Sequence, residues 1–147
     1  MNLSRSEVES IVRDVIREEL GQGLPRARQV DASGVIGIDP AAITPEPFPF
    51  PIESDRVQLV DVLSLDESPR LGCGVMEMDH TKFAWTLAYD EIDIVLDGTL
   101  EVLVDGRAVR AAAGQVIYIP KNTAIRFSTP DHVRFLYVCY PANWAQR

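Results

Sequence analysis

The stretch WTLAYDEIDIVLDGTLEV, from Trp85 to Val102, decides the fold of this 147-residue chain. Its apolar and alternating segments are typical of strands that turn one face to a core. The alternation places Tyr89, Glu91, Asp93 and Val95 on one face, and their immediate neighbours on the other. Two carboxyl groups are therefore expected on the same face of the strand.

The chain from about residue 56 onward also consists of short apolar or alternating segments that are typical of strands. Asp97-Gly98 and Asp105-Gly106 predict hairpin turns, because glycine adopts positive φ readily. Pro120 and Pro130 are each expected to end a strand. The strands are predicted in the segments VQLVDVLSL, LGCGVMEMD, FAWTLAY, EIDIVLDG, TLEVLVDG, RAVRAAAG, QVIYIP, AIRFS and VRFLYVCY. Many short strands at this spacing predict an all-β sandwich or small barrel over residues 56–147.

The N-terminal residues 1–21 predict a short amphipathic helix. Ser4 with Glu7, or Ser6 with Glu9, has the spacing of a capping box, and Gly21 is a suitable stop. The apolar residues recur at three- and four-residue steps: Val8, Ile11, Val12, Val15, Ile16 and Leu20. A helix this short needs a partner for that face, either its own domain or another protein.

Residues 22–55 are expected to be a linker followed by a proline-rich extended segment. Alternating prolines between Pro40 and Pro51 exclude helix and central strand. The interleaved Phe48, Phe50 and Ile52 predict that this segment lies against a surface.

The spacing of the barrel segments resembles the cupin family. Cupins carry the motifs Gly-x5-His-x-His-x3-4-Glu-x6-Gly and Gly-x5-Pro-x-Gly-x2-His; here Gly98 follows Glu91 after six residues and Pro120 follows Gly114 after five. The resemblance implies a cupin (RmlC-like) double-stranded β-helix, a jelly-roll barrel, preceded by the helix and the proline-rich segment.

The metal ligands of that motif are missing. The first two histidine positions fall on Ala84 and Thr86, or on Trp85 and Leu87, and the third falls on Ile125. One carboxylate among such side chains does not bind a transition metal, so no metal site and no metal-dependent dioxygenase is expected. The histidines present, His80 and His132, are expected at the surface or in hydrogen bonds.

Four segments resemble the cupin domain of the ethanolamine-utilisation EutQ proteins: LDESPRLGCGVMEMD, FAWTLAYDEIDIVLDGTLEVLVDG, VIYIPKNTAIRF and VRFLYVCYPANWA. The resemblance covers roughly residues 30–145, and those proteins also lack the metal histidines. It implies a role in ethanolamine or related aminoalcohol catabolism and an acetate kinase activity, with ATP and Mg²⁺ as its cofactors. No other tightly bound cofactor is expected.

The segment LSRSEVESIVRDVIREEL is similar to the encapsulation helices that target enzymes into bacterial microcompartments. This similarity implies that residues 1–21 dock on shell proteins or core enzymes, and that the chain resides in the microcompartment lumen within the cytoplasm. The alternative to an enzyme is therefore a non-enzymatic assembly or cargo-recruiting protein.

The candidate catalytic residues are Glu91, Asp93 and Tyr89. Without a metal, burial and mutual repulsion should raise the pKa of at least one of the carboxyl groups, so that the pair can hold a proton near neutral pH. In the alternative reading, the two carboxylates only satisfy backbone donors, or Arg126 and Arg134. The candidate ligand-binding residues are Trp85, Tyr118, Lys121 and Arg126.

Charge and composition limit the classes of partner that the chain is expected to bind. The formal net charge of -8 and the lack of a basic patch argue against nucleic acid and anionic membranes. No apolar run approaches the ~18 residues of a membrane span. The two cysteines, Cys73 and Cys139, are expected to be reduced and buried, and fold analogy predicts a homodimer.

Overall fold

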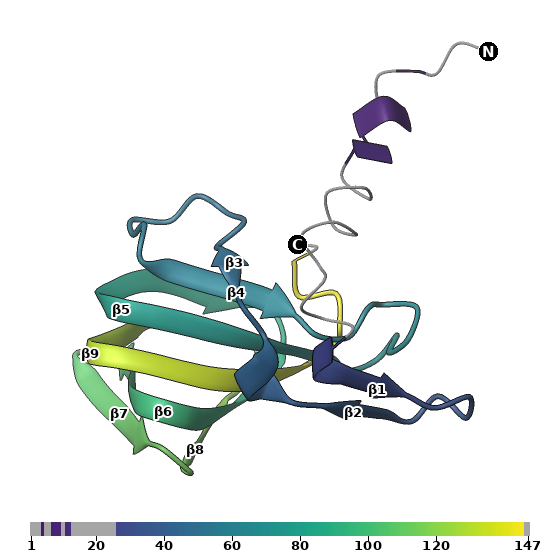
Figure 1. Cartoon of the computed structure of the whole chain (residues 1–147). Coiled ribbons are helices and arrows are strands. Elements are labelled where there is room, and N and C mark those ends of the chain that lie inside the picture. The colour runs from purple at the N-terminus through teal and green to yellow at the C-terminus, as the bar shows by residue number, and fades with distance from the viewer. Residues whose placement is uncertain (1–3, 5–6, 10, 13–25, 146–147) are drawn as a thin grey trace. The chain divides into compact units, whose positions relative to one another are not determined.

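A computed structural model of the chain describes residue 4 and residues 7–9, 11–12 and 26–145 (Figure 1). The chain divides into two compact units, Met1–Thr44 and Pro45–Arg147. Within the described residues, no helix is long and apolar enough to cross a membrane.

The first unit begins with a helical segment whose described residues are 7–9 and 11–12. A capping box starts it: the Ser4 N–H donates to Glu7 Oε2 at 2.7 Å, and the Glu7 N–H donates to Ser4 Oγ at 3.3 Å. The predicted pairing of Ser4 with Glu7 is thus confirmed. The rest of the predicted helix, with its stop at Gly21, lies outside the described residues.

A short hairpin follows within the segment expected to be a linker. Strand β1 (Arg28–Val30) pairs antiparallel with β2 (Ile36–Ile38). A 3-10 turn, η1 (Pro40–Ala42), comes next, and its N-cap residue Asp39 accepts a hydrogen bond from the Ala41 N–H at 3.1 Å.

The second unit is a seven-stranded antiparallel sheet. Its order is β3-β4-β5-β9-β6-β7, and β8 also pairs with β6. Strand β9 runs between β5 and β6, so it is the central strand (Figure 1). The strands are β3 (Glu46–Pro47), β4 (Val57–Asp61), β5 (Gly72–Leu87), β6 (Asp90–Val104), β7 (Arg107–Ala112), β8 (Val116–Ile119) and β9 (Thr123–Tyr140).

The three longest strands are irregular at the same level of the sheet. β5 has a bulge between Asp79 and Thr81, and β6 shifts register on both sides of Gly98. The β9 residues opposite the β5 bulge are 130–131, and those opposite the β6 shift between Gly98 and Glu101 are 129–132. Bulges bend strands, so this common line lets the sheet roll into a jelly roll with one interior.

Two predicted strand ends are wrong for this reason. Asp97-Gly98 lies inside β6, where Gly98 (φ 77°) uses its positive φ for a bulge rather than for a hairpin turn. Pro130 lies inside β9 opposite the β5 bulge, a position where a missing N–H is tolerated. Pairs of predicted short strands are therefore joined into β5, β6 and β9. Asp105-Gly106 is confirmed as the turn between β6 and β7, and Pro120 is confirmed as the end of β8.

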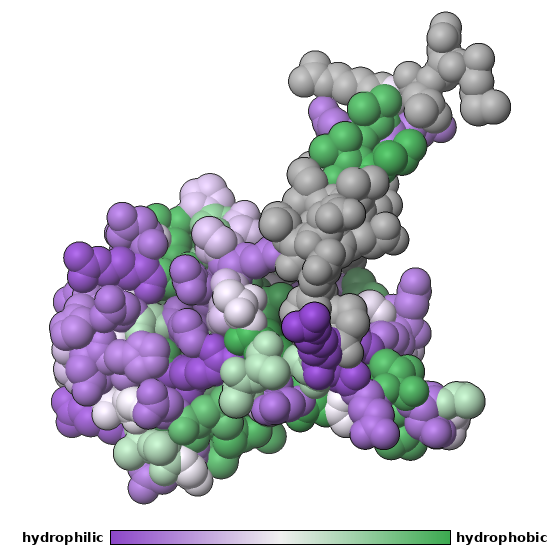
Figure 2. All heavy atoms as spheres, in the orientation of Figure 1, coloured by the Kyte–Doolittle hydropathy of each residue, from purple (hydrophilic) through white to green (hydrophobic). Residues whose placement is uncertain are grey.

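The core consists of inward-facing side chains from both halves of the rolled sheet. Burying one large apolar side chain contributes roughly 1.5–3 kcal/mol, so this cluster supplies the main stabilisation. Outward-facing side chains make much of the visible surface over the sheet hydrophilic (Figure 2). The largest fully buried apolar side chains include Phe83, Phe127, Phe135, Met78, Leu87 and Leu100.

Gly98 and Gly106 allow a matched test of the bend. An added Cβ at Gly98 would lie 1.8 Å from the carbonyl oxygen of His132, whereas at Gly106 (φ 75°) it would meet nothing within 4 Å. We expect Gly106→Ala to lower the free energy of unfolding by roughly 1–2 kcal/mol, the cost of positive φ alone. Gly98→Ala should lower it by at least about 4 kcal/mol, because backbone must move. Urea denaturation measures both; equal losses would show that the close approach is not a constraint.

Candidate functional site

Strand β6 places the predicted acidic residues in the interior, as the alternation indicates. The exposed fractions are 4% for Tyr89, 6% for Glu91 and 0% for Asp93, while Ile92 between them is 43% exposed. The predicted face of this strand is confirmed. In the sheet, Asp93 lies opposite Ile117 of β8 and Tyr137 of β9.

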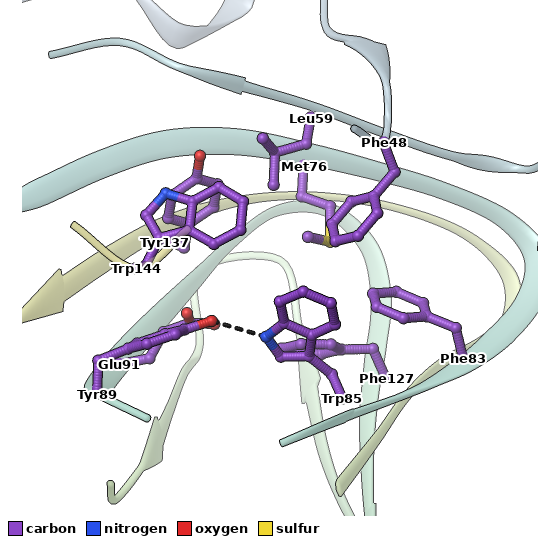
Figure 3. Close-up of a pocket in the computed structure, with 10 residues that line it drawn as sticks. All are labelled: Phe48, Leu59, Met76, Phe83, Trp85, Tyr89, Glu91, Phe127, Tyr137 and Trp144. Carbon is purple, nitrogen blue, oxygen red and sulfur yellow. Dashed lines mark hydrogen bonds between the residues drawn. The ribbon is translucent and has the colours of Figure 1, made fainter. Parts of the chain in front are cut away.

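Glu91 lines a small cavity whose other walls are apolar and aromatic (Figure 3). The space inside is about 10 Å³, room for about one water molecule. Its wall contains one ionisable carboxyl group and no Arg, Lys or His. The lining residues are Phe48, Leu59, Met76, Phe83, Trp85, Tyr89, Glu91, Phe127, Tyr137 and Trp144.

Aromatic rings pack around this cavity from three parts of the second unit. Phe48 of the proline-rich segment meets Trp85 edge to face at 5.3 Å between ring centroids, and Phe50 meets Trp144 at 5.8 Å. Phe50 and Ile52 also pack on the core. The prediction that the proline-rich segment lies against a surface is confirmed, and that surface is the aromatic side of the pocket.

Hydrogen bonds fix several of these rings. The Trp85 indole N–H donates to the Tyr89 hydroxyl oxygen at 2.8 Å (Figure 3). Asp61 Oδ1 accepts from the Tyr137 hydroxyl at 2.5 Å and from the Trp144 indole N–H at 3.0 Å. The charge of Asp61 is thus paired with two donors, which distinguishes it from the two β6 carboxyl groups.

The β6 carboxyl groups lack such partners. Neither oxygen of Asp93 has a hydrogen-bond partner, although the side chain is fully buried. Burial raises the pKa of Glu91 to about 7, and burial followed by the charge of Glu91 raises the pKa of Asp93 well above its usual value. The pair therefore keeps at least one proton at neutral pH. It does not satisfy Arg126 or Arg134, because these bond to Glu53 and Glu77.

Of the residues expected to bind ligand, only Trp85 lies at the cavity. Tyr118 is 61% exposed and its hydroxyl donates to Asp90 Oδ1 at 3.4 Å; the Lys121 backbone N–H donates to the same atom at 2.8 Å. Arg126 is partly exposed and pairs with Glu53. The structure therefore brings Trp85 to the catalytic candidates and leaves Tyr118, Lys121 and Arg126 outside the pocket.

The sequence reasoning missed Tyr137 and Trp144. The alternation of VRFLYVCY could have placed Tyr137 on the inner face with Phe135, because the same two-residue period applies. Trp144 follows the last strand, where no periodicity indicates a side-chain direction.

The histidines and cysteines are not part of this site. His80 is exposed and bonded to Asp79, and His132 lies 3.6 Å from a carboxylate oxygen of Asp97, as expected for surface residues. Both cysteines are free; Cys139 is buried, whereas Cys73 is only partly buried. Burial raises the pKa of the Cys139 thiol to about 12, so it stays protonated. In the described part of the chain, no group of three His, Cys, Asp or Glu side chains is placed to hold a metal ion.

The rolled antiparallel sheet with one enclosed interior has the fold of the cupin class. A cupin domain of Schizosaccharomyces pombe Cnp3 matches with a TM-score of 0.57 at 16% identity over 71% of this chain and 68% of the other, a likeness of fold alone. The family model "Ethanolamine utilisation protein EutQ" matches residues 3–146, so the chain belongs to the EutQ family.

Similar proteins support this membership. "Acetate kinase EutQ" of Clostridioides difficile is 45% identical, and the match covers 99% of this chain and 97% of that one. The protein of the same name from Salmonella typhimurium is 38% identical over 96% of this chain, which spans 63% of its length. A solved Clostridium difficile EutQ structure has a TM-score of 0.73 at 48% identity, covering 82% of this chain and 90% of that one.

The carboxyl pair should make folding stability depend on pH. A pKa of Glu91 raised from 4.5 to about 7 means that the folded chain holds a proton that the unfolded chain has lost, so stability falls as pH rises through this window. The shift corresponds to roughly 3 kcal/mol. We expect the melting temperature to drop by several degrees more between pH 5 and pH 8 in the wild type than in the Glu91→Gln/Asp93→Asn variant.

Differential scanning calorimetry measures this difference, with Asp90→Asn as the control because Asp90 faces out of the barrel. If the double variant keeps the full pH dependence of the wild type, the raised pKa values are contradicted.

Proposed function

We propose that this chain acts in ethanolamine utilisation by binding a small organic molecule in the cupin interior, beside Glu91 and Asp93. The observation that carries the proposal is the buried carboxyl pair: Glu91 lines the cavity, and the fully buried Asp93 behind the cavity wall has no hydrogen-bond partner other than Glu91. A purely structural acid would be expected to have its donors in place, because an unpaired buried polar group costs roughly 1–3 kcal/mol. A bound ligand would supply the hydrogen-bond donors that the protein does not provide.

The carboxyl pair is suited to proton exchange with that ligand. A group with a pKa near 7 can both donate and accept a proton at physiological pH, which is the property of an efficient general acid or base. Tyr89 follows the same face and holds its hydroxyl at Trp85, so it orients the ring side of the pocket. These three residues remain the proposed catalytic group.

Acetate kinase activity is a second proposal, supported by the names of the relatives. Its reactants carry phosphates, and phosphoryl transfer uses Mg²⁺ with cationic side chains against them. Mg²⁺ keeps several waters in an octahedral shell, whereas this cavity has room for about one water and no cationic lining. ATP and Mg²⁺ therefore do not fit the interior as it is packed. We place the phosphates outside it, at exposed basic residues such as Lys121.

One comparison of variants tests both proposals. Glu91→Gln should abolish the rise in melting temperature that ethanolamine or acetate gives to the wild type, because the interior loses an ionisable group. The same variant should keep the formation of ATP from acetyl phosphate and ADP within about threefold. Lys121→Ala should lower kcat/KM for ATP formation at least tenfold, since it removes charge that neutralises phosphate.

The opposite pattern would place phosphoryl transfer in the interior and contradict the external phosphate site. A wild type that forms no ATP would remove the kinase proposal, and a wild type stabilised by neither ethanolamine nor acetate would remove the interior site.

Recruitment to a microcompartment is proposed for the N-terminal helix. Val8, Ile11 and Val12 are 44%, 49% and 48% exposed, and their spacing places them on one helical face. Figure 2 shows these apolar residues in green within the described part of the segment. An exposed apolar face on a capped helix is suited to docking in a groove of a shell protein or core enzyme.

We expect Val8→Asp/Ile11→Asp to abolish co-purification of the chain with isolated microcompartments, because charges would be buried on docking. Glu9→Gln is the matched control and should co-purify as the wild type does. Immunoblotting of microcompartment fractions measures both. If the double variant is retained at the wild-type level, the docking proposal is wrong.

The homodimer stays a prediction. The outer face of β6 and β8 carries exposed apolar side chains, among them Ile92, Val116 and Tyr118, which a second copy would cover.

A further inference from the structure

We infer that the interior pocket recognises a small primary ammonium ion, with the –NH₃⁺ group at Glu91, beside Asp93, and the carbon chain against the aromatic rings. This inference names the ligand class of the interior site and rests on that part of the proposed function. It does not require the kinase activity.

The acidic groups select a cation. Asp93 offers two buried oxygen acceptors without a partner, and Glu91 beside it lines the cavity. An –NH₃⁺ group carries three donors and a positive charge, so at Glu91 it would bond to that carboxylate and offset the negative charge of the pair. An anion would add negative charge beside the carboxyl pair, where the cavity wall has no cationic side chain. The electrostatics therefore favour ammonium over acetate or phosphate.

The rings favour an organic cation over an inorganic one. Trp85 and Trp144 lie with their centroids 6.3 Å apart, and Tyr89 and Tyr137 lie 6.5 Å and 6.3 Å from Trp144. The faces of such rings attract cations, and Trp does so most strongly. Their apolar surface also takes up alkyl carbon, which a hydrated metal ion does not offer. Acid and aromatic walls together match the two ends of an alkylammonium ion.

The size of the cavity favours a primary amine. A space of about 10 Å³ holds one water molecule, so only the –NH₃⁺ head fits inside as the residues are packed, and the carbon chain would extend through the open side of the pocket. A trimethylammonium head is much larger and would have to displace the ring packing between Phe48 and Trp85, where the centroids are 5.3 Å apart. The pocket should therefore discriminate strongly between primary and quaternary ammonium ions.

Binding should become tighter as pH rises. The ionisable groups near Glu91 and Asp93 are Tyr137 and Cys139 of β9 and Asp61 of β4, with Tyr89 beside them, and none is cationic. The carboxyl pair holds a proton at neutral pH, and that proton must leave when the ammonium ion enters. Release of one proton from a group with a pKa of about 7 gives about a tenfold gain in affinity from pH 6 to pH 8.

The test is a titration of the full-length chain with 2-aminoethanol, followed by intrinsic fluorescence. The two tryptophans of the chain, Trp85 and Trp144, both line the pocket, so their emission reports its occupancy. Ethylene glycol is the neutral analogue of the probe and choline is its quaternary analogue. We expect saturable binding of 2-aminoethanol, about tenfold tighter at pH 8 than at pH 6, and at least tenfold weaker binding of the other two.

Variants distinguish binding of 2-aminoethanol in the pocket from binding at the surface. Glu91→Gln and Asp93→Asn should each weaken binding of 2-aminoethanol at least tenfold and reduce its pH dependence. Asp90→Asn is the matched control: Asp90 lies on the outer face of the same strand, so binding should be unchanged. Calorimetric melting shows whether each variant is folded.

Three results would overturn the inference: equal binding of ethylene glycol, binding unaffected by both interior variants, or no saturation by 2-aminoethanol with the folded wild type. Stabilisation by acetate in place of the amine would contradict the ammonium class and leave the proposed interior site standing. Amine binding by a chain that forms no ATP would leave the inference standing and remove only the kinase proposal.

Discussion

The rest of the structure depends on the bend that β5, β6 and β9 share. At Gly98 the backbone of β6 passes so close to the His132 carbonyl that no side chain fits, and β5 bulges at the same level. The two halves of the sheet can then turn their inner faces toward each other, which closes one apolar core. Glu91 and Asp93 are buried only because this closure surrounds the first half of β6.

Burial of these acids disfavours their charged forms, and the surrounding residues do not offset this cost with hydrogen-bond donors. Asp61, in the same unit, is held by Tyr137 and Trp144, whereas Asp93 has no hydrogen-bond partner other than Glu91. The difference shows that the barrel can satisfy an interior carboxylate and does not do so on β6. Groups left in this state are concentrated at binding and catalytic sites, where a ligand completes the interaction. The proposed function and the proposed ammonium ligand both follow from this contrast.

Local patterns predicted the features that depend on neighbouring residues. The two-residue period placed Tyr89, Glu91 and Asp93 on one face, and the three-residue spacing of the capping box paired Ser4 with Glu7. The same kind of reasoning failed at Asp97-Gly98. Glycine with positive φ serves a hairpin turn and a bulge equally well, so the dipeptide alone does not distinguish a strand that reverses from one that bends.

Spacing along the chain was sufficient to predict the all-β cupin fold, the resemblance to the EutQ family and the common face of Glu91 and Asp93 on β6. The tertiary structure decided which side chains meet. Arg126 pairs with Glu53, 73 residues away, rather than with the interior acids, and Trp144 reaches the pocket from beyond the last strand. Such contacts depend on the register of strands far apart in sequence and on the common bend, and neither is encoded in the period of a single strand.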